Sequence, residues 1–235
     1  MKQHYSIILT EAHFYGDSMN SKFKEKLIAF FAYDCICCGR AVNTDGKIFC
    51  KECENELFSK DIIEENGIIS VINYKSESAR SLILTMKDYK IKDVFSYSAK
   101  LIASKIRERN IPSLDEYYIS FAPRNIKSLV RKRFDQSYEI GKRLSVELFG
   151  SKRRCIPLFR GSLFSREQKT LDYKGRKANV GKHLNLLPFI KVPRKLIILD
   201  DVTTTGATLL ALREIALKNG AEECILCSVA KQNLE

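Results

Sequence analysis

The sequence predicts an α/β protein in which helices flank a parallel sheet, with a small cysteine-rich module near the N-terminal end. Three observations predict this fold. Two C-x-x-C pairs lie close together before residue 60, strand-length and helix-length apolar patterns alternate after it, and the most apolar stretch ends in two adjacent aspartates. Strands and helices that alternate along a chain are typical of a parallel sheet.

The length and composition suit one ordinary domain with a small appendage. The chain has 235 residues, of which 45% are hydrophobic and 29% are charged. Domains of 100 to 150 residues are the commonest, roughly, so the chain has material for a full core. We expect an N-terminal extension or lead-in over 1–30, a cysteine module over 31–62 and the larger α/β domain over 63–235.

The ends of the chain carry no signal for export or membrane insertion. No apolar run approaches the ~20 residues that cross a bilayer, and the apolar core of Met1–Leu9 falls short of the roughly seven residues of a secretory signal. The sequence therefore predicts a cytoplasmic protein without a membrane span. Met19 is an alternative start, so Met1–Ser18 is either native or an extension, and Leu234–Glu235 is either native or a cloning scar.

The first cysteines form two pairs, Cys35 with Cys38 and Cys50 with Cys53. In a reducing cytosol, clustered thiols more often bind metal than form disulfides. Four thiolates suit a tetrahedral Zn²⁺ and leave no position for a reacting water, so we expect a structural zinc ribbon. The alternatives are unpaired or redox-active thiols and an iron–sulfur cluster. Cys37 leaves the register open, because Cys35-x-Cys37 is also available.

The segment between the two pairs contains Thr44–Gly46, a turn signal typical of a hairpin.

The spacing of the next two cysteines predicts a different role. A third C-x-x-C, Cys224 and Cys227, falls in a predicted strand, where residues three apart point to opposite faces. We therefore expect these two to be buried small hydrophobes rather than metal ligands.

After the cysteine module, strand and helix patterns alternate without an internal repeat. Continuous apolar stretches predict strands, and apolar residues spaced by three and four predict helices. The predicted strands span 68–74, 117–122, 195–199 and 224–229, and the predicted helices span 95–106, 140–148 and 209–216.

The strand over 195–199 leads into Asp200, Asp201 and a threonine-rich loop that opens into a helix. Backbone N–H groups over 204–208 can converge on an anion at the helix N-terminus, and Gly206 permits close approach. Adjacent carboxylates accept hydrogen bonds from vicinal hydroxyls and hold Mg²⁺ through water. The expected phosphate-binding residues are Thr203, Thr204, Thr205, Gly206, Ala207 and Thr208. The alternative is a solvated strand end followed by an ordinary helix cap.

This acidic pair and Thr-Thr-Gly loop resemble the fingerprint of type I phosphoribosyltransferases. The stretch lacks the glycine and lysine spacing of a nucleoside-triphosphate P-loop, which disfavours an ATPase. The resemblance implies a type I phosphoribosyltransferase-like sheet that binds phosphoribosyl diphosphate or ribose 5-phosphate together with Mg²⁺. If catalysis occurs, the resemblance makes Asp200 and Asp201 the catalytic residues that orient the sugar and stabilise its developing positive charge.

The order of motifs from Cys35 nearly to the C-terminus is similar to that of the ComF competence proteins. The motifs are the double C-x-x-C, Phe-Ala-Pro-Arg over 121–124, Lys-Arg-Phe-Asp-Gln over 132–136, and Gln168, Leu171, Arg176 and Asn179–Val180 ahead of the Asp-Asp loop. The family's middle motif typically reads Arg-Gly-Phe-Asn-Gln. Arg133 and Asp135 depart from that pattern, whereas Phe134 and Gln136 match it.

The ComF resemblance implies DNA uptake in natural transformation, with a helicase-type or recombination-mediator protein as partner. It also implies that Arg124 contacts the diphosphate, since a guanidinium suits phosphate oxygens; the alternative is a solvated arginine after a proline. Phe134 is either core packing, which we favour, or a platform for a base.

Positive charge is concentrated in the middle of the sequence. Residues 124–182 contain seventeen Lys and Arg against five Asp and Glu, a surplus equal to the net charge of +12 for the whole chain. Basic runs interleaved with aromatics favour single-stranded DNA binding; the alternative is a solvated basic face. The candidate nucleic-acid contacts are Arg131, Lys132, Arg133, Lys152, Arg153, Arg154, Lys174, Arg176 and Lys177.

Two classes of function therefore stay open. The first is a DNA-uptake protein that handles single strands in the cytosol and binds a ribose phosphate. The second is an active phosphoribosyltransferase that acts on a nucleobase in salvage, for which the zinc ribbon and the basic runs have no evident use. No segment identifies the hood element that would hold a base, so binding without turnover is compatible with the sequence.

Overall fold

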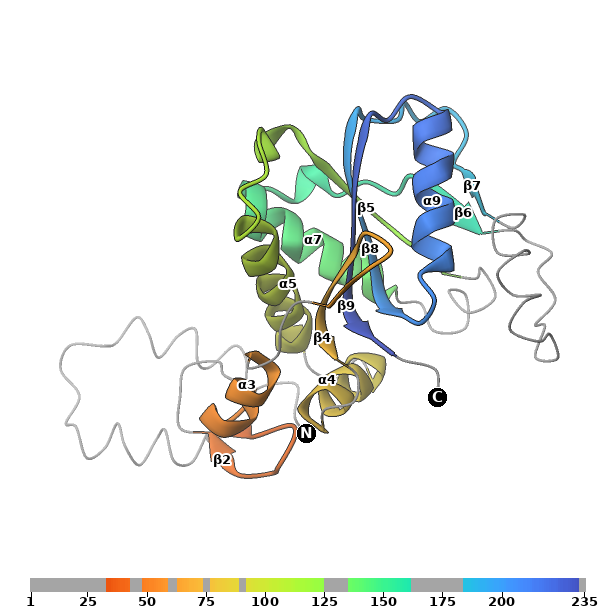
Figure 1. The fold of residues 1–235 in the computed structure, drawn as a ribbon. Coiled ribbons are helices and arrows are strands. Elements are labelled where there is room, and N and C mark those ends of the chain that lie inside the picture. Colours follow the sequence, from red (N-terminus) through yellow and green to blue (C-terminus); the bar gives the residue numbers. More distant parts are fainter. Residues whose placement is uncertain are drawn as a thin grey trace, which may run out of the picture.

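The computed structural model of the protein describes residues 33–42, 48–58, 63–73, 77–88, 92–124, 135–161 and 184–232. Its centre is a five-stranded sheet in the order β3-β4-β9-β8-β5 (Figure 1). The strands are β3 (Ile63–Glu65), β4 (Ile68–Asn73), β9 (Glu223–Lys231), β8 (Lys195–Thr203) and β5 (Tyr118–Phe121). All neighbouring pairs are parallel except β3 with β4. The structure confirms a mixed α/β fold with a mostly parallel sheet.

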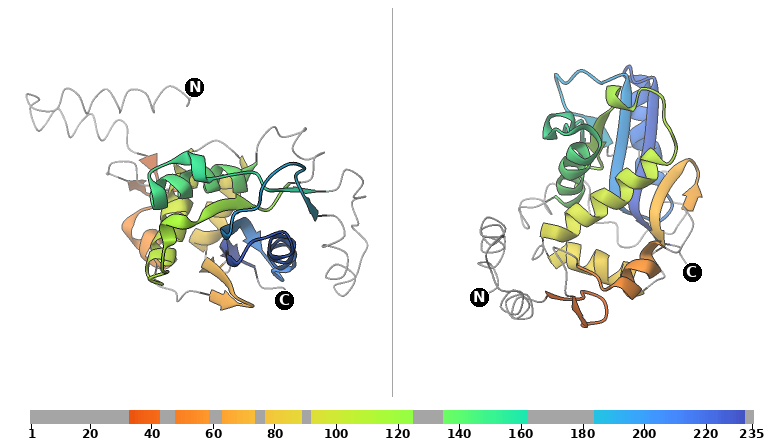
Figure 2. Two further views of the ribbon diagram at one scale, coloured as in Figure 1. Left: turned by 90° about the horizontal axis from the view of Figure 1, so that it is seen from above. Right: turned by 90° about the vertical axis from the view of Figure 1, so that its left-hand side faces the viewer.

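Helices cover both faces of this sheet. α5 (Lys92–Arg107) and α7 (Gln136–Phe149) lie on one face, and α9 (Ala207–Lys218) lies on the other (Figures 1 and 2). β8 contributes to two buried clusters, with Ile197 and Leu199 in one and Leu196 and Ile198 in the other. A strand buried on both sides needs apolar residues at successive positions, which explains the continuous apolar run.

The predicted strands and helices fall on observed elements, with one informative difference. The stretches 68–74, 95–106, 117–122, 140–148, 209–216 and 224–229 fall on β4, α5, β5, α7, α9 and β9. β8 is longer than the predicted strand over 195–199, because Asp200, Val202 and Thr203 still pair with β9. The acidic pair therefore lies inside the strand, and the loop that follows is short.

The cysteine module is small and packs against two helices. It contains the two-residue strands β1 (Tyr33–Asp34) and β2 (Ala41–Val42), and helix α3 (Lys51–Phe58). Ser78 of α4 (Glu77–Asp88) donates a hydrogen bond to Glu56 at 2.5 Å, and the ring of Phe49 lies 5.3 Å from that of Tyr97 on α5. The turn predicted at Thr44–Gly46 lies outside the described residues, and the boundary between 31–62 and 63–235 stays a prediction.

The smaller elements lie around the sheet. They are the 3-10 turns η2 (Leu114–Glu116) and η3 (Lys152–Arg154) and the antiparallel ribbon of β6 (Phe159–Gly161) and β7 (Leu184–Leu186). Cys227 belongs to the buried cluster on the α5 side, and Cys224 packs against the cluster on the α9 side, as strand alternation predicts. Within the described residues, no helix combines the length and the apolar character that a membrane crossing requires.

Candidate functional site

The structure brings the two C-x-x-C pairs into one cluster. One sulfur from each of Cys35, Cys38, Cys50 and Cys53 lies within 4.8 Å of all the others, and the Sγ atoms of Cys38 and Cys50 are 3.6 Å apart. A tetrahedron with Zn–S bonds of about 2.3 Å has edges of about 3.8 Å. The cluster therefore has the dimensions to hold a tetrahedral metal ion, which confirms the predicted pairing.

Cys37 is not part of this cluster. The hydroxyl of Ser78 on α4 donates to Cys37 Sγ at 3.4 Å. Among the described residues, the group that can hold a metal contains only the four cysteines of the two C-x-x-C pairs. The structure thus resolves the register that the sequence left open.

The four thiols differ in their electrostatic surroundings. The pKa of Cys38, which is exposed, is lowered to about 6, chiefly because the backbone N–H of Arg40 donates a hydrogen bond to its sulfur. Burial raises the pKa of Cys53, and neighbouring cysteines raise it further. Thiolates held this close repel one another, so a bound cation is needed to keep all four ionised.

Asp200 and Asp201 lie near the carboxyl end of β8. The backbone N–H of Asp201 donates to Asp200 Oδ1 at 2.9 Å, and that of Val202 donates to Asp201 Oδ1 at 2.8 Å. Burial raises the pKa of Asp200 well above its ordinary value, and the charge of Asp201 raises it further. Ionisation of Asp200 beside Asp201 is therefore unfavourable unless a cation or a hydrogen-bond donor approaches the pair.

The loop after β8 leads directly into α9. Thr203 is buried, and its carbonyl accepts from the backbone N–H of Gln232 at 2.8 Å. Thr205 Oγ1 accepts from the N–H of Ala207 at 3.3 Å. Gly206 has a φ of +75°, and a Cβ there would collide with Ile68 Cδ1. The loop needs glycine at this position both for its backbone conformation and for its approach to β4.

Arg124 lies beside the acidic pair, and its partners include Asp201 and Gln136. It follows the end of β5, and its Nη2 lies 3.9 Å from Asp201 Oδ2. The same guanidinium donates to Gln136 Oε1 at the start of α7. Gln136 is buried, and its Nε2 has no hydrogen-bond acceptor among the described residues. The guanidinium therefore faces the acidic pair and is oriented by a buried amide.

Asp135 adds a third acidic residue that sequence reasoning did not assign to this site. It caps α7 by accepting from the N–H of Tyr138 at 3.1 Å. Burial raises its pKa, while Arg124 lowers it and Asp201 raises it. An aspartate directly before a helical stretch is an N-cap signal that predicts the capping role. Its proximity to Asp201 depends on tertiary structure, because the two lie far apart in sequence.

The candidate nucleic-acid residues that can be placed lie at the other end of the sheet. Lys152–Arg154 form η3, and the next residue, Cys155, bridges to Ile119 near the start of β5. Arg154 donates to the carbonyl of Asp115, and its guanidinium lies 5.4 Å from the ring of Tyr118. The structure therefore does not bring η3 and the acidic pair together. The other candidates, Arg131, Lys132, Arg133, Lys174, Arg176 and Lys177, lie outside the described residues.

Comparisons with known proteins add a remote similarity to solved structures. No family model matches the sequence, and no curated protein matches it. Among solved structures, the chain is similar to a hypoxanthine-guanine phosphoribosyltransferase from Bacillus anthracis that holds a HEPES molecule in its active site. The two are 14% identical, the match covers 60% of this chain and 70% of that one, and the TM-score is 0.37. A TM-score this low does not establish a shared fold.

Proposed function

We propose that the protein binds a phosphorylated ribose, such as phosphoribosyl diphosphate or ribose 5-phosphate, beside the end of β8. One observation carries the proposal: two adjacent carboxylates lie just before a short threonine loop that opens the N-terminus of α9. Helix N-termini bind phosphate, and carboxylates bind vicinal hydroxyls. The arrangement offers both functions within one short segment.

Each group has a role set by its chemistry. The 5′-phosphate accepts hydrogen bonds from backbone N–H groups over 204–208 and from the threonine hydroxyls, while Thr203 fixes the start of the loop. Asp200 and Asp201 accept from the ribose hydroxyls, and Arg124 offers its guanidinium to the diphosphate. Because Arg124 already contacts Asp201, diphosphate and Asp201 compete for the same cation.

The two carboxylates of Asp200 and Asp201 are suitable ligands for Mg²⁺. Burial and the neighbouring Asp201 raise the pKa of Asp200, so the pair lacks sufficient compensating charge. Hard cations prefer oxygen ligands, and Asp200 and Asp201 would hold the ion. The chemistry that Mg²⁺ would supply there is compensation of the negative charge of the diphosphate. In a transferase reaction, Asp200 and Asp201 would orient the sugar while a nitrogen nucleophile replaces diphosphate at the anomeric carbon.

We also propose that the four-cysteine cluster holds a structural Zn²⁺. Its four sulfur donors suit zinc and leave no coordination position for a substrate. The cluster lies within the same buried core as residues of α4 and α5. Zinc binding would therefore stabilise the contact between the module and these helices.

For the biological role, we propose a cytoplasmic protein of natural transformation that handles incoming single-stranded DNA. The resemblance of the motif order to ComF proteins and the basic surplus over 124–182 support this role. A helicase or a recombination mediator is the corresponding protein partner. The alternative is a base-salvage transferase, in which the same ribose-phosphate site performs turnover with a nucleobase.

Calorimetric titration with phosphoribosyl diphosphate and Mg²⁺ tests the ribose-phosphate site. We expect binding that Asp200→Asn/Asp201→Asn abolishes and that Asp115→Asn, a change at the far end of the sheet, leaves intact. Equal binding by the double variant would overturn the proposed site.

Diphosphate release then separates the two roles. We would measure it with nucleobases and with single-stranded DNA as separate acceptors. Release that needs a nucleobase and both aspartates would establish the salvage alternative. Ligand binding without release, together with salt-sensitive binding of single strands, would support a DNA-handling protein.

A further inference from the structure

A hollow lies at the amino ends of β5 and β8, away from the acidic pair. It has a volume of about 500 Å³, and its apolar wall comprises Tyr118, Ile156, Val192 and Pro193. Pockets that hold small ligands span roughly 300–1,000 Å³. The eight steps of β8 from Lys195 to Thr203 separate this hollow from the threonine loop by about 26 Å, at ~3.3 Å per residue. The hollow is therefore distinct from the ribose-phosphate site.

Cations surround the hollow, and they differ in how far they are neutralised. Lys195 Nζ lies 2.9 Å from Glu116 and 3.6 Å from Glu223, and Arg194 pairs with Glu222 at 2.6 Å. These ion pairs leave little charge for a ligand.

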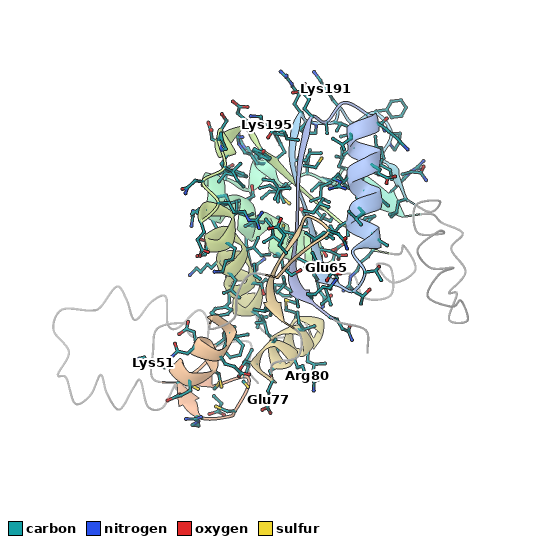
Figure 3. The ribbon with its side chains drawn as sticks, viewed as in Figure 1. Lys51, Glu65, Glu77, Arg80, Lys191 and Lys195 are labelled. Carbon is teal, nitrogen blue, oxygen red and sulfur yellow. The ribbon has the colours of Figure 1, made fainter. Side chains whose placement is uncertain are left out.

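Lys191 is exposed and has no ion-pair partner within the described residues. Figure 3 shows Lys191 and Lys195 at the end of the molecule opposite Lys51 and Glu77. η3 adds the exposed Lys152 and Arg153, which likewise have no carboxylate partner in the described part of the chain. An anion at this end would meet these three cations.

Aromatic rings accompany these cations. Tyr118 lines the hollow with 37% of its surface exposed, and the Arg154 guanidinium lies 5.4 Å from its ring. Phe189, two residues before Lys191, is fully exposed at 106% and has a φ of +65°. A bulky residue rarely adopts this conformation, and a ring in water adds nothing to the core. The ring of Phe189 is therefore not part of the core and is accessible to a ligand.

We propose that this surface, from η3 across the hollow to Phe189, binds single-stranded nucleic acid. Bases would stack on Phe189 and Tyr118, and phosphates would contact Lys191, Lys152 and Arg153. A single strand offers both flat π faces and a regular line of negative charge, whereas a duplex hides its base faces. The inference rests on the nucleic-acid part of the proposed function and gives it a location.

The test uses the full chain and a fluorescent oligothymidine of about 16 nucleotides, the upper end of known site sizes. Anisotropy titrations at several salt concentrations compare Phe189→Ala and Lys191→Ala with the wild type. Two exposed residues on helices away from this surface supply matched controls: Leu84→Ala on α4 for the lost apolar side chain and Lys100→Ala on α5 for the lost charge.

The two variants should affect binding in different ways, one through the affinity and the other through its dependence on salt. Phe189→Ala should weaken binding about fivefold or more with an unchanged salt slope, because it removes stacking. Lys191→Ala should lower the slope of log K against log salt by about 0.7, because it removes one phosphate contact. Duplex of the same length should bind more weakly, and neither control should change binding.

The outcomes separate the two levels of the proposal. If the wild type does not bind oligothymidine at low salt, both the nucleic-acid function and this surface are wrong. If the wild type binds and both variants bind equally well, the function stands and this location is wrong. If thymidine monophosphate competes at the same concentration of nucleotide, the hollow is a mononucleotide site and the strand-binding inference is overturned.

Discussion

The cysteine module and the threonine loop each present ligand-binding groups, but the fold supports them in opposite ways. In the part of the module that the structure describes, there are two strands of two residues and one eight-residue helix, so few backbone hydrogen bonds fix the shape of that part. The loop instead joins a nine-residue strand to a twelve-residue helix within a buried core. We infer that the module needs its ligand in order to fold, whereas the loop is formed in advance of its ligand.

Removal of the metal should have the largest effect. Apparent zinc-binding free energies of about 10–16 kcal/mol in small zinc-finger peptides are also folding free energies. We expect Cys53→Ser to lose the metal and to lower Tm by about 10 °C or more. Elemental analysis and a thermal scan measure this effect.

The core explains why the loss should extend beyond the module. Cys53, Phe49 and Leu57 lie in one buried cluster with residues of α4 and α5. Cys37→Ser is the matched control, because Cys37 lies outside the metal cluster. A Cys53→Ser protein with an unchanged Tm would show that the module folds without its ion, and the comparison would fail.

Asp200→Asn should move binding and stability in opposite directions. Loss of a charged hydrogen-bond acceptor should weaken binding of phosphoribosyl diphosphate by roughly 10- to 100-fold. Without ligand, however, the variant should be more stable than the wild type at neutral pH. A calorimetric titration measures the first effect, and thermal scans over a pH series measure the second.

The sign of the second effect follows from the pKa. The folded pKa of Asp200 is raised above its ordinary value of 3.8. Protonation therefore favours the folded state, and that stabilisation is lost as pH rises through the raised pKa. The gain in Tm for Asp200→Asn should grow with pH and vanish in acid. A loss of stability at every pH would mean that Asp200 supports the fold.

Gly206→Ala should show how much the left-handed backbone conformation at this position contributes to the stability of the loop. A non-glycine residue in the left-handed region costs about 1–2 kcal/mol. The added Cβ would also meet Ile68 Cδ1, which is the flexible end of a side chain. We expect a drop in Tm of a few °C together with weaker ribose-phosphate binding.

The double variant Gly206→Ala/Ile68→Val separates the two causes. It removes the colliding methyl group but keeps the strained φ. Partial recovery of Tm, measured by thermal scan against Ile68→Val alone, is the expected result. Full recovery would mean that the left-handed conformation costs nothing here.

The smallest effect should come from the third C-x-x-C. Cys224→Ala/Cys227→Ala should keep the zinc content of the wild type, because the two side chains pack on opposite faces of β9. Elemental analysis checks this, and a lower zinc content in the folded variant would contradict it.

The sequence predicts the parts of each site that are contiguous. The two cysteine pairs and the Asp-Asp-threonine segment have local signals, since spacing and residue type determine the chemistry there. The cluster of Arg124, Asp135 and Gln136 with Asp201 has no such signal. These residues come from three separate elements, and only the pairing of β5 with β8 and the packing of α7 bring them together.

The same reasoning explains what was missed at the other end of the sheet. The run Lys152–Arg154 has the composition of a phosphate-binding segment. In the fold it lies beside the start of β5, whereas Asp200 lies near the opposite end of the neighbouring strand β8, and the sequence does not reveal this separation. Periodicity also cannot reveal that Phe189 is exposed in a left-handed turn, because an isolated phenylalanine normally predicts core.

The position of β9 in the sheet has a consequence for synthesis on the ribosome. β9 follows the other described strands in sequence, yet it lies between β4 and β8. Until it emerges, β4 and β8 have no common neighbour, and both expose an unpaired edge. The described sheet therefore cannot close until β9 has left the ribosome. Until then, these two edges are open to wrong pairing, and we expect chaperones that shield strand edges to raise the yield of folded protein.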